Sequence, residues 1–412
     1  MKFKKSDILF TLLSILFFTL EIDAQIINGA DLLFSENSEL ISGKNIGVVC
    51  NHTALLSNGT HLVDALLDQK NVKVKAIFTP EHGFKGLAEA GEIVDYKNNL
   101  YKNIPIISLY GKERKPSAEN LKDIDLLIFD IQDVGARFYT YISTLYYTLE
   151  SAGENNIPII ILDRPNPIGG NYVDGPVLDL KFKSFVGIAS IPIAHGMTVG
   201  ELAKYFVGEQ LIPTWKNISL TVIECKNWGR EIPNEFFDKW NSPSPNINSV
   251  ETAIVYPGIC LLEGTNISEG RGTELPFIQF GAPFINSKDV IALINKQKTA
   301  GIELEPVSFT PKDIPEIATN PKYKDELCNG LKVKITAPDK FESVKFGVIF
   351  ISVVSKLYPK EFKFKDVSFD RLSGTDKLRQ QIEKKLSPDK IFASWQKELS
   401  KFKKIRKKYL LY

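Results

Sequence analysis

The stretch IDLLIFDIQDVGARFYTY, residues Ile124–Tyr141, carries the pattern that decides the fold. Its first part, Ile124–Phe129, is a short apolar run rich in branched side chains, which is typical of a strand buried in a parallel sheet. Polar residues follow at once, and a helical pattern runs from Tyr139 to Glu150. A buried strand that leads directly into a helix predicts one β-α unit of an α/β fold.

Three more apolar runs of this kind occur in the first half of the chain, at Ile46–Cys50, Val72–Phe78 and Ile157–Leu162. Helix-compatible sequence such as Leu62–Leu67 lies between them, and Ile104–Tyr110 predicts one further strand. The alternation of strands and helices predicts a parallel sheet with right-handed crossovers.

The second half of the chain is less regular. We expect Leu220–Glu224 to complete the first sheet, strands near Leu304–Phe309 and Leu331–Ile335, and a helical, basic tail from Thr375 whose lysines form a solvated face. The length of 412 residues allows two compact domains, and we place a boundary near Thr273.

Polar residues gather where the predicted strands end. In open α/β sheets this edge binds ligands, because loops from several strands converge there beside helix N-termini. No GxGxxG follows the first strand and no GxxxxGK[ST] occurs, so nucleotide and dinucleotide sites lack support. The four polar segments are Asn51–Thr53, Thr79–Gly83, Asp130–Asp133 and Asp163–Pro167.

The net charge argues against some classes of partner, and the cysteine spacing argues against some kinds of site. The chain has 51 Lys and Arg against 49 Asp and Glu, so its net charge of +2 creates no field that would attract nucleic acid or an anionic membrane. The four cysteines show no CxxC spacing, and we expect buried free thiols.

The N-terminus reads as a secretory signal peptide. Lys2, Lys4 and Lys5 precede an apolar run, Ile8–Leu20, of about 13 residues, shorter than the roughly 20 that a spanning helix needs. We expect cleavage near Ala24, no stable membrane insertion, and an exported protein that is periplasmic or secreted. The alternative is a retained N-terminal anchor.

Several polar clusters could carry chemistry. Glu81, Glu89 and Glu92 lie within twelve residues that also contain three glycines, and clustered carboxylates suit acid and base catalysis at a glycosidic bond. The run Glu263–Thr273 has the composition of a binding loop. His82 and His195 could join Asp130 and Asp133 in a metal site, but HExxH spacing is absent, and we expect no metal and no cofactor.

At these residues the sequence resembles the NamZ-type exo-β-N-acetylmuramidases, a family long known only as a domain of unknown function. The resemblance spans essentially the whole chain after the N-terminal segment. The motifs that carry it are TPEHGFKG, SLYG, DIQDVGARFYTYISTL, LDRPNPIGG, PIAHGMTVGELA, YPGICLLEGTNISEGRGTE and the closing KYLLY; Asp174 stands in DGP where Glu is common.

We expect a signal peptide at 1–24, a catalytic domain at 25–272 and an auxiliary domain at 273–412. The resemblance implies that the catalytic domain is Rossmann-like, that the C-terminal domain is a smaller α/β domain, and that the active site lies in the cleft between them. It implies hydrolysis of the β-1,4 bond of terminal N-acetylmuramic acid in peptidoglycan fragments, during cell-wall turnover or salvage. The implied catalytic candidates are Glu92, Glu81, Glu263 and Glu269. The implied substrate contacts are Asp130, Arg137, Tyr139, Asp163, Arg164, Asn166, His195, Asn266 and Arg271.

The substrate's chemistry fits these residue types. Muramic acid carries a lactyl carboxylate that a bidentate arginine such as Arg137 or Arg271 could bind, and aromatic faces such as that of Tyr139 can stack on a sugar ring. Two alternatives stay open: a non-catalytic protein that binds muramyl sugars, and a metal-dependent hydrolase that uses His82, Asp130 and Asp133.

Overall fold

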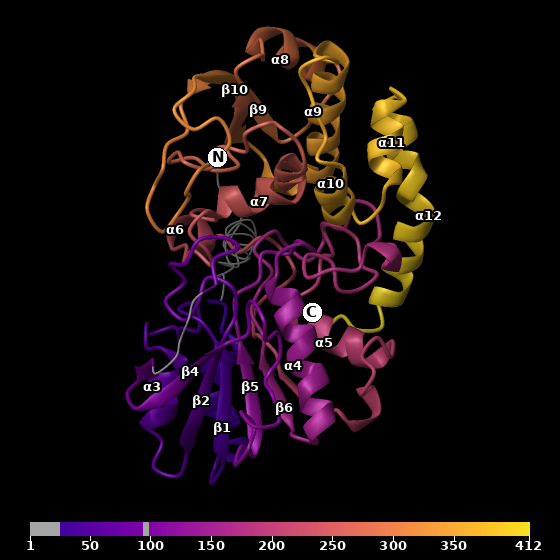
Figure 1. Cartoon of the computed structure of the whole chain (residues 1–412). Helices are drawn as coiled ribbons and strands as arrows, with labels where there is room; N and C mark the ends of the chain where they lie inside the picture. The colour runs from indigo at the N-terminus through magenta and orange to yellow at the C-terminus, as the bar shows by residue number, and fades with distance from the viewer. Residues whose placement is uncertain (1–24, 94–98) are drawn as a thin grey trace, which may run out of the picture.

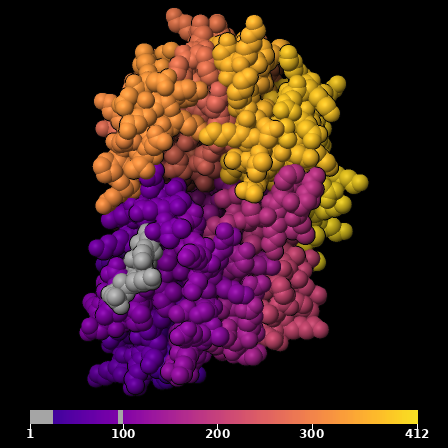
Figure 2. All heavy atoms as spheres, in the orientation of Figure 1, coloured from indigo at the N-terminus to yellow at the C-terminus, as the bar shows by residue number. Residues whose placement is uncertain are grey.

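The computed structural model describes residues 25–93 and 99–412 of the chain (Figure 1). The predicted signal peptide lies outside the described residues. The described chain forms two units that pack on one another, and Figure 2 shows the first unit below and the second above, joined over a broad boundary. The α/β class expected from the sequence is confirmed.

The first unit is built on a seven-stranded sheet in the order β3-β4-β2-β1-β5-β6-β7. All neighbouring strands pair in parallel except β3 and β4. Without the short β3, the order along the chain is 3-2-1-4-5-6, which is the Rossmann arrangement. The strands are β1 (Asn45–Cys50), β2 (Lys73–Thr79), β3 (Leu100–Tyr101), β4 (Ile104–Ser108), β5 (Leu126–Asp130), β6 (Ile159–Leu162) and β7 (Leu220–Ile223), so every strand predicted in this unit is confirmed.

Helices cover both faces of this sheet. Alternate side chains of a strand point to opposite faces, so Val48 packs with α2 (Gly29–Glu36) and α3 (Leu62–Leu67), whereas Val49 joins the opposite core. That opposite face is covered by two other helices, α4 (Tyr141–Asn155), which the sequence predicted, and α5 (Val199–Gly208). α5 begins with a capping box in which the side chains of Thr198 and Glu201 each accept the other's backbone N–H.

The second unit contains a three-stranded antiparallel sheet in the order β8-β10-β9. Two of its helices, α7 (Val250–Ile259) and α9 (Ser343–Leu357), cross where Gly258 meets Gly347. A Cβ on Gly258 would lie 1.8 Å from the carbonyl oxygen of Ser343. The elements are α6 (Glu235–Asp238), α7 (Val250–Ile259), β8 (Gln279–Ala282), α8 (Ser287–Asn295), β9 (Ile302–Phe309), β10 (Cys328–Ile335), α9 (Ser343–Leu357) and α10 (Asp366–Ser373). The boundary near Thr273 stays a prediction, and the packing of α7 against α9 favours an earlier one.

The C-terminal tail returns to the first unit. Its helices are α11 (Lys377–Glu383) and α12 (Pro388–Arg406), and in Figure 1 α12 runs down the side of the molecule towards α5. The Tyr412 hydroxyl donates to Asp163 at 2.7 Å and accepts from the backbone N–H of Cys225 at 2.8 Å. The lysines near the tail's end are exposed, as predicted, whereas Arg406 is buried and donates to the carbonyls of Gly170 and Gly196.

The four cysteines, Cys50, Cys225, Cys260 and Cys328, are all buried free thiols, as the sequence predicted. None of the helices that the structure describes is both long enough and apolar enough to span a lipid bilayer.

Arg137 ties the two units together. Its side chain is buried, and one terminal nitrogen donates to the carbonyls of Pro176 at 2.8 Å and Ile191 at 3.0 Å. The other terminal nitrogen donates to the carbonyl of Leu372, in α10, at 2.6 Å. A buried cation that satisfies three carbonyls from separate segments fixes their relative positions.

We therefore predict that Arg137→Met destabilises the protein, because three buried carbonyls lose their donor. The free energy of unfolding should fall by about 3 kcal/mol, measured by denaturant titration. The matched control is Lys115→Met, at an ion pair on the surface. Unchanged stability together with a raised KM would instead identify Arg137 as a substrate contact.

Candidate active site

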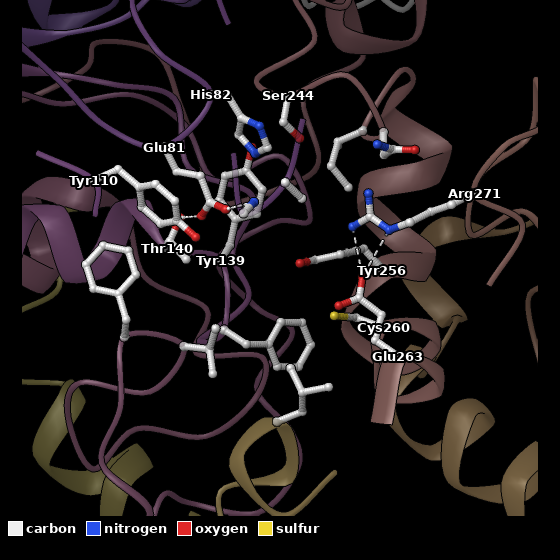
Figure 3. Close-up of a pocket in the computed structure, with 18 of the residues that line it drawn as sticks. Glu81, His82, Tyr110, Tyr139, Thr140, Ser244, Tyr256, Cys260, Glu263 and Arg271 are labelled. Atoms are coloured by element: carbon white, nitrogen blue, oxygen red, sulfur yellow. Dashed lines mark hydrogen bonds and ion pairs between the residues drawn. The ribbon is translucent and has the colours of Figure 1, made fainter. Parts of the chain in front are cut away.

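A cavity of about 470 Å³ lies where the parallel strands end, between the two units. Loops that follow β2, β4 and β5 form its wall in the first unit, and segments around α7 form much of the opposite wall. This is the sheet edge that the sequence indicated. Figure 3 shows the labelled side chains: Glu81, His82, Tyr110, Tyr139, Thr140, Ser244, Tyr256, Cys260, Glu263 and Arg271.

Glu81 is the carboxylate of the first wall. One of its oxygens accepts from the backbone N–H of Gly91 at 2.8 Å, and the other accepts from the Thr140 hydroxyl at 2.6 Å. Burial, together with the neighbouring Glu81 carboxylate, raises the pKa of Tyr110 to about 12, so this hydroxyl stays protonated at neutral pH. The carboxylate of Glu81 is thus held in a single orientation at the cavity.

His82 stands beside Glu81 in a strained turn, with a backbone φ of +69°. Burial lowers the pKa of its imidazole, against an opposing effect from Glu81. A neutral imidazole carries one N–H, and Nδ1 lies 2.7 Å from the carbonyl oxygen of Ala88, which can only accept. Nε2 is therefore an acceptor in the neutral ring.

Aromatic rings form an apolar part of the cavity. The Tyr139 and Tyr256 ring centroids are 6.0 Å apart, and those of Tyr256 and Phe277 are 4.9 Å apart, both edge to face. Burial raises the pKa values of the Tyr139 and Tyr256 hydroxyls, so both rings stay neutral at physiological pH. Such rings offer faces on which a sugar can stack.

Glu263 and Arg271 form the charged part of the second wall. Arg271 Nη2 lies 2.8 Å from a carboxylate oxygen of Glu263, and its Nε lies 3.6 Å from Glu269. The guanidinium also lies over the Phe277 ring, 5.2 Å from its centroid. Glu269 is buried and pairs with Lys322 at 2.9 Å, so it supports Arg271 from behind the cavity.

The predicted candidates therefore separate by position. Glu81, Tyr139, Glu263 and Arg271 line the cavity together, and Glu269 lies directly behind them. Glu92 does not line it, although its neighbours Gly91 and Ile93 do. The exposed Glu92 carboxylate accepts instead from the backbone N–H of Glu89 at 2.9 Å.

The other predicted substrate contacts do not line the cavity, and all of them except the half-buried Asn266 are buried. Their polar atoms bind neighbouring protein groups, because side chains at a strand end can also turn inward to fix the loops. Asp130 pairs with Arg164 at 2.9 Å, Asp163 accepts from Thr198, Gly200 and Tyr412, Asn166 donates to Met197, His195 accepts from Met197, Asn266 donates to Glu361, and Arg137 holds three carbonyls. Their roles at a ligand stay predictions.

Several cavity residues were not among the predicted candidates. Tyr110 is the last residue of the predicted strand Ile104–Tyr110, but β4 ends at Ser108, so an earlier strand end would have identified it. Thr140 lies within the predicted helical pattern, which drew attention away from it. Tyr256 lies within an apolar run and Phe277 beyond the polar run, and nothing in their local sequence marks them.

Metal-binding geometry is missing from the described residues, where no group of three or more His, Cys, Asp and Glu side chains converges. His195 and Asp133 approach one another at 3.6 Å, and Asp130 is already paired with Arg164. The four donors that suggested a metal site therefore do not converge on one point.

Comparison with known proteins agrees with this architecture. Family models described as the N-terminal and C-terminal parts of exo-beta-N-acetylmuramidase NamZ match residues 46–251 and 254–412. The peptidoglycan beta-N-acetylmuramidase NamZ of Bacillus subtilis (strain 168) is 44% identical over 388 residues, which cover 93% of this chain and 91% of the relative.

Two crystal structures of DUF1343 family proteins from Bacteroides fragilis NCTC 9343 are also similar. One is 32% identical with a TM-score of 0.85, the other 38% identical with a TM-score of 0.77. Each match covers 94% of this chain and 99% of the solved one. The chain therefore belongs to the exo-β-N-acetylmuramidase NamZ family.

Proposed function

We propose that this protein is a glycoside hydrolase that removes N-acetylmuramic acid from the non-reducing end of peptidoglycan fragments by cleaving its β-1,4 bond. Its active site is the cavity between the two units. The observation that carries the proposal is the pair of carboxylates, Glu81 and Glu263, that face this cavity from different units (Figure 3). The relative from Bacillus subtilis is itself a peptidoglycan beta-N-acetylmuramidase.

The size and lining of the cavity support a sugar ligand. A volume of about 470 Å³ is within the range of small-molecule sites, which suits a terminal sugar better than a long glycan. Tyr139, Tyr256 and Phe277 supply aromatic surface, and charged groups lie around them. The aromatic faces can pack on the apolar face of a sugar ring, and the carboxylates beside them can accept hydrogen bonds from its hydroxyl groups.

The surroundings of Glu81 suit a group that transfers a proton to the leaving oxygen. Thr140 donates to the carboxylate in this structure, but a hydroxyl can rotate and accept instead. Thr140 can therefore stabilise Glu81 both with and without its proton. A catalytic acid needs both states, because it gives up its proton as the glycosidic bond breaks.

Glu263 faces the other side of the sugar, oriented by Arg271. Two routes are compatible with this arrangement. In the first, Glu263 acts directly at the anomeric carbon, as a nucleophile or by activating water. In the second, the substrate's own 2-acetamido oxygen attacks that carbon, and Glu263 orients the amide group.

We also propose that the protein is exported and acts in the periplasm or outside the cell. The basic start and short apolar run before Ala24 support this. Export would bring the enzyme to its substrate, since peptidoglycan lies outside the cytoplasmic membrane.

The direct test is product analysis with the disaccharide N-acetylmuramyl-β-1,4-N-acetylglucosamine. We predict that the protein releases both free sugars in equal amounts, quantified by mass spectrometry. A protein that only binds muramyl sugars would show saturable binding without product, even after long incubation, and would refute the hydrolase assignment.

The two candidate carboxylates on the β2 loop can be told apart by mutation. We predict that Glu81→Gln lowers kcat by at least about 100-fold, because an amide cannot supply the proton. Glu92→Gln should retain most activity, because that carboxylate binds the backbone of Glu89. Thermal unfolding checks that both variants fold. The reverse result would make Glu92 the acid and require the loop to rearrange around the substrate.

The metal-dependent alternative predicts a different response to chelation. We expect EDTA treatment followed by gel filtration to leave kcat and KM unchanged, because carboxylates alone provide the proposed chemistry. Loss of activity that added Zn²⁺ or Mg²⁺ restores would instead favour a hydrolase that uses His82, Asp130 and Asp133.

A further inference from the structure

The proposed substrate differs from N-acetylglucosamine by one group, a lactyl ether that ends in a carboxylate. A site specific for it needs a cation that is available to pair with that carboxylate. Lys112, Arg114 and Arg271 are the Lys and Arg side chains among the described residues that line the cavity. On the proposed function, one of these three cations binds the lactyl carboxylate.

The two arginines that the sequence suggested are already engaged. Arg271 lies between the carboxylates of Glu263 and Glu269, so a third carboxylate would have to compete with both. Burial by itself would lower the pKa of Arg271, but the carboxylates of Glu263 and Glu269 outweigh it and raise the pKa. The positive charge of Arg271 is therefore already balanced by two protein carboxylates. Arg137 lies outside the cavity and donates to three backbone carbonyls.

Lys112 and Arg114 differ from both. They line the cavity from the loop after β4, their side chains are exposed, and within residues 25–93 and 99–412 neither forms an ion pair. Carboxylates are within reach of the same loop, since Lys115 pairs with Glu150 and Glu154. The two lining cations are thus the ones left without a protein anion.

Arg114 is also held in position by aromatic packing. Its guanidinium lies over the Phe185 ring, 5.0 Å from the centroid. Phe185 in turn packs against Tyr110 at 5.6 Å and stacks on Tyr147 at 6.3 Å. A guanidinium placed on an aromatic face loses less freedom when it binds a carboxylate, and its planar N–H groups match two carboxylate oxygens.

We propose that Arg114, assisted by Lys112, binds the lactyl carboxylate of the terminal muramic residue and thereby determines specificity. Phe185 and Tyr110 hold the guanidinium at the cavity, and Arg271 serves Glu263 instead.

The test compares two ligands that differ only in this charge: N-acetylmuramic acid and its lactyl methyl ester. Their dissociation constants are measured by calorimetry for the native protein, Arg114→Gln and Lys115→Gln. Lys115→Gln is the matched control, because it removes the same charge from the same loop but does not line the cavity. Arg114 is exposed, so its replacement should not prevent folding.

We expect the native protein and Lys115→Gln to bind the acid about tenfold more tightly than the ester, and Arg114→Gln to bind the two almost equally. Arg114→Lys should restore part of the preference. Added NaCl should weaken binding of the acid more in the native protein than in Arg114→Gln, because salt screens an exposed charge pair and only Lys112 remains in the variant.

An unchanged preference in Arg114→Gln, or no preference in the native protein, would overturn the proposal. Failure of the proposed function can be told apart from failure of this proposal. If the protein is not a hydrolase, the disaccharide stays uncleaved, but the dissociation constants of the acid and the ester can still be compared.

Discussion

Burial of both faces of the parallel sheet is the constraint on which the rest of the structure depends. Successive residues of one strand, such as Val48 and Val49, enter different cores. The core on the α4 side continues without a break into the second unit, where it includes Phe280 and Phe346. The second unit is therefore fixed against the first, and the strand ends meet its wall to form the cavity.

Much of the first unit could be predicted because its strands are short apolar runs and polar residues mark their ends. Which of those residues reach a ligand could not be. Asp130 and Glu81 both follow buried strands, yet Asp130 turns inward to Arg164 while Glu81 faces the cavity. That difference depends on loop conformations, such as the positive φ of His82, which strand patterns do not encode.

The second unit was harder to predict because its local patterns are ambiguous. The run Thr252–Leu262 contains Pro257 and Gly258, which would usually end a helix, yet it forms most of α7 because Gly258 allows close packing on α9. Tyr256, on the same helix, meets Tyr139 from the first unit only after the two units pack. Cavity residues that come from both units follow from tertiary structure and not from local sequence.

The contact of Tyr412 with Asp163 and Cys225 also has a consequence for the order of folding. Tyr412 stands 249 positions after Asp163, and the whole second unit lies between them in the sequence. The first unit therefore reaches its final state only after the second unit has been synthesised. Contacts between residues so far apart in the sequence form late, so the two units complete their fold together and not one after the other.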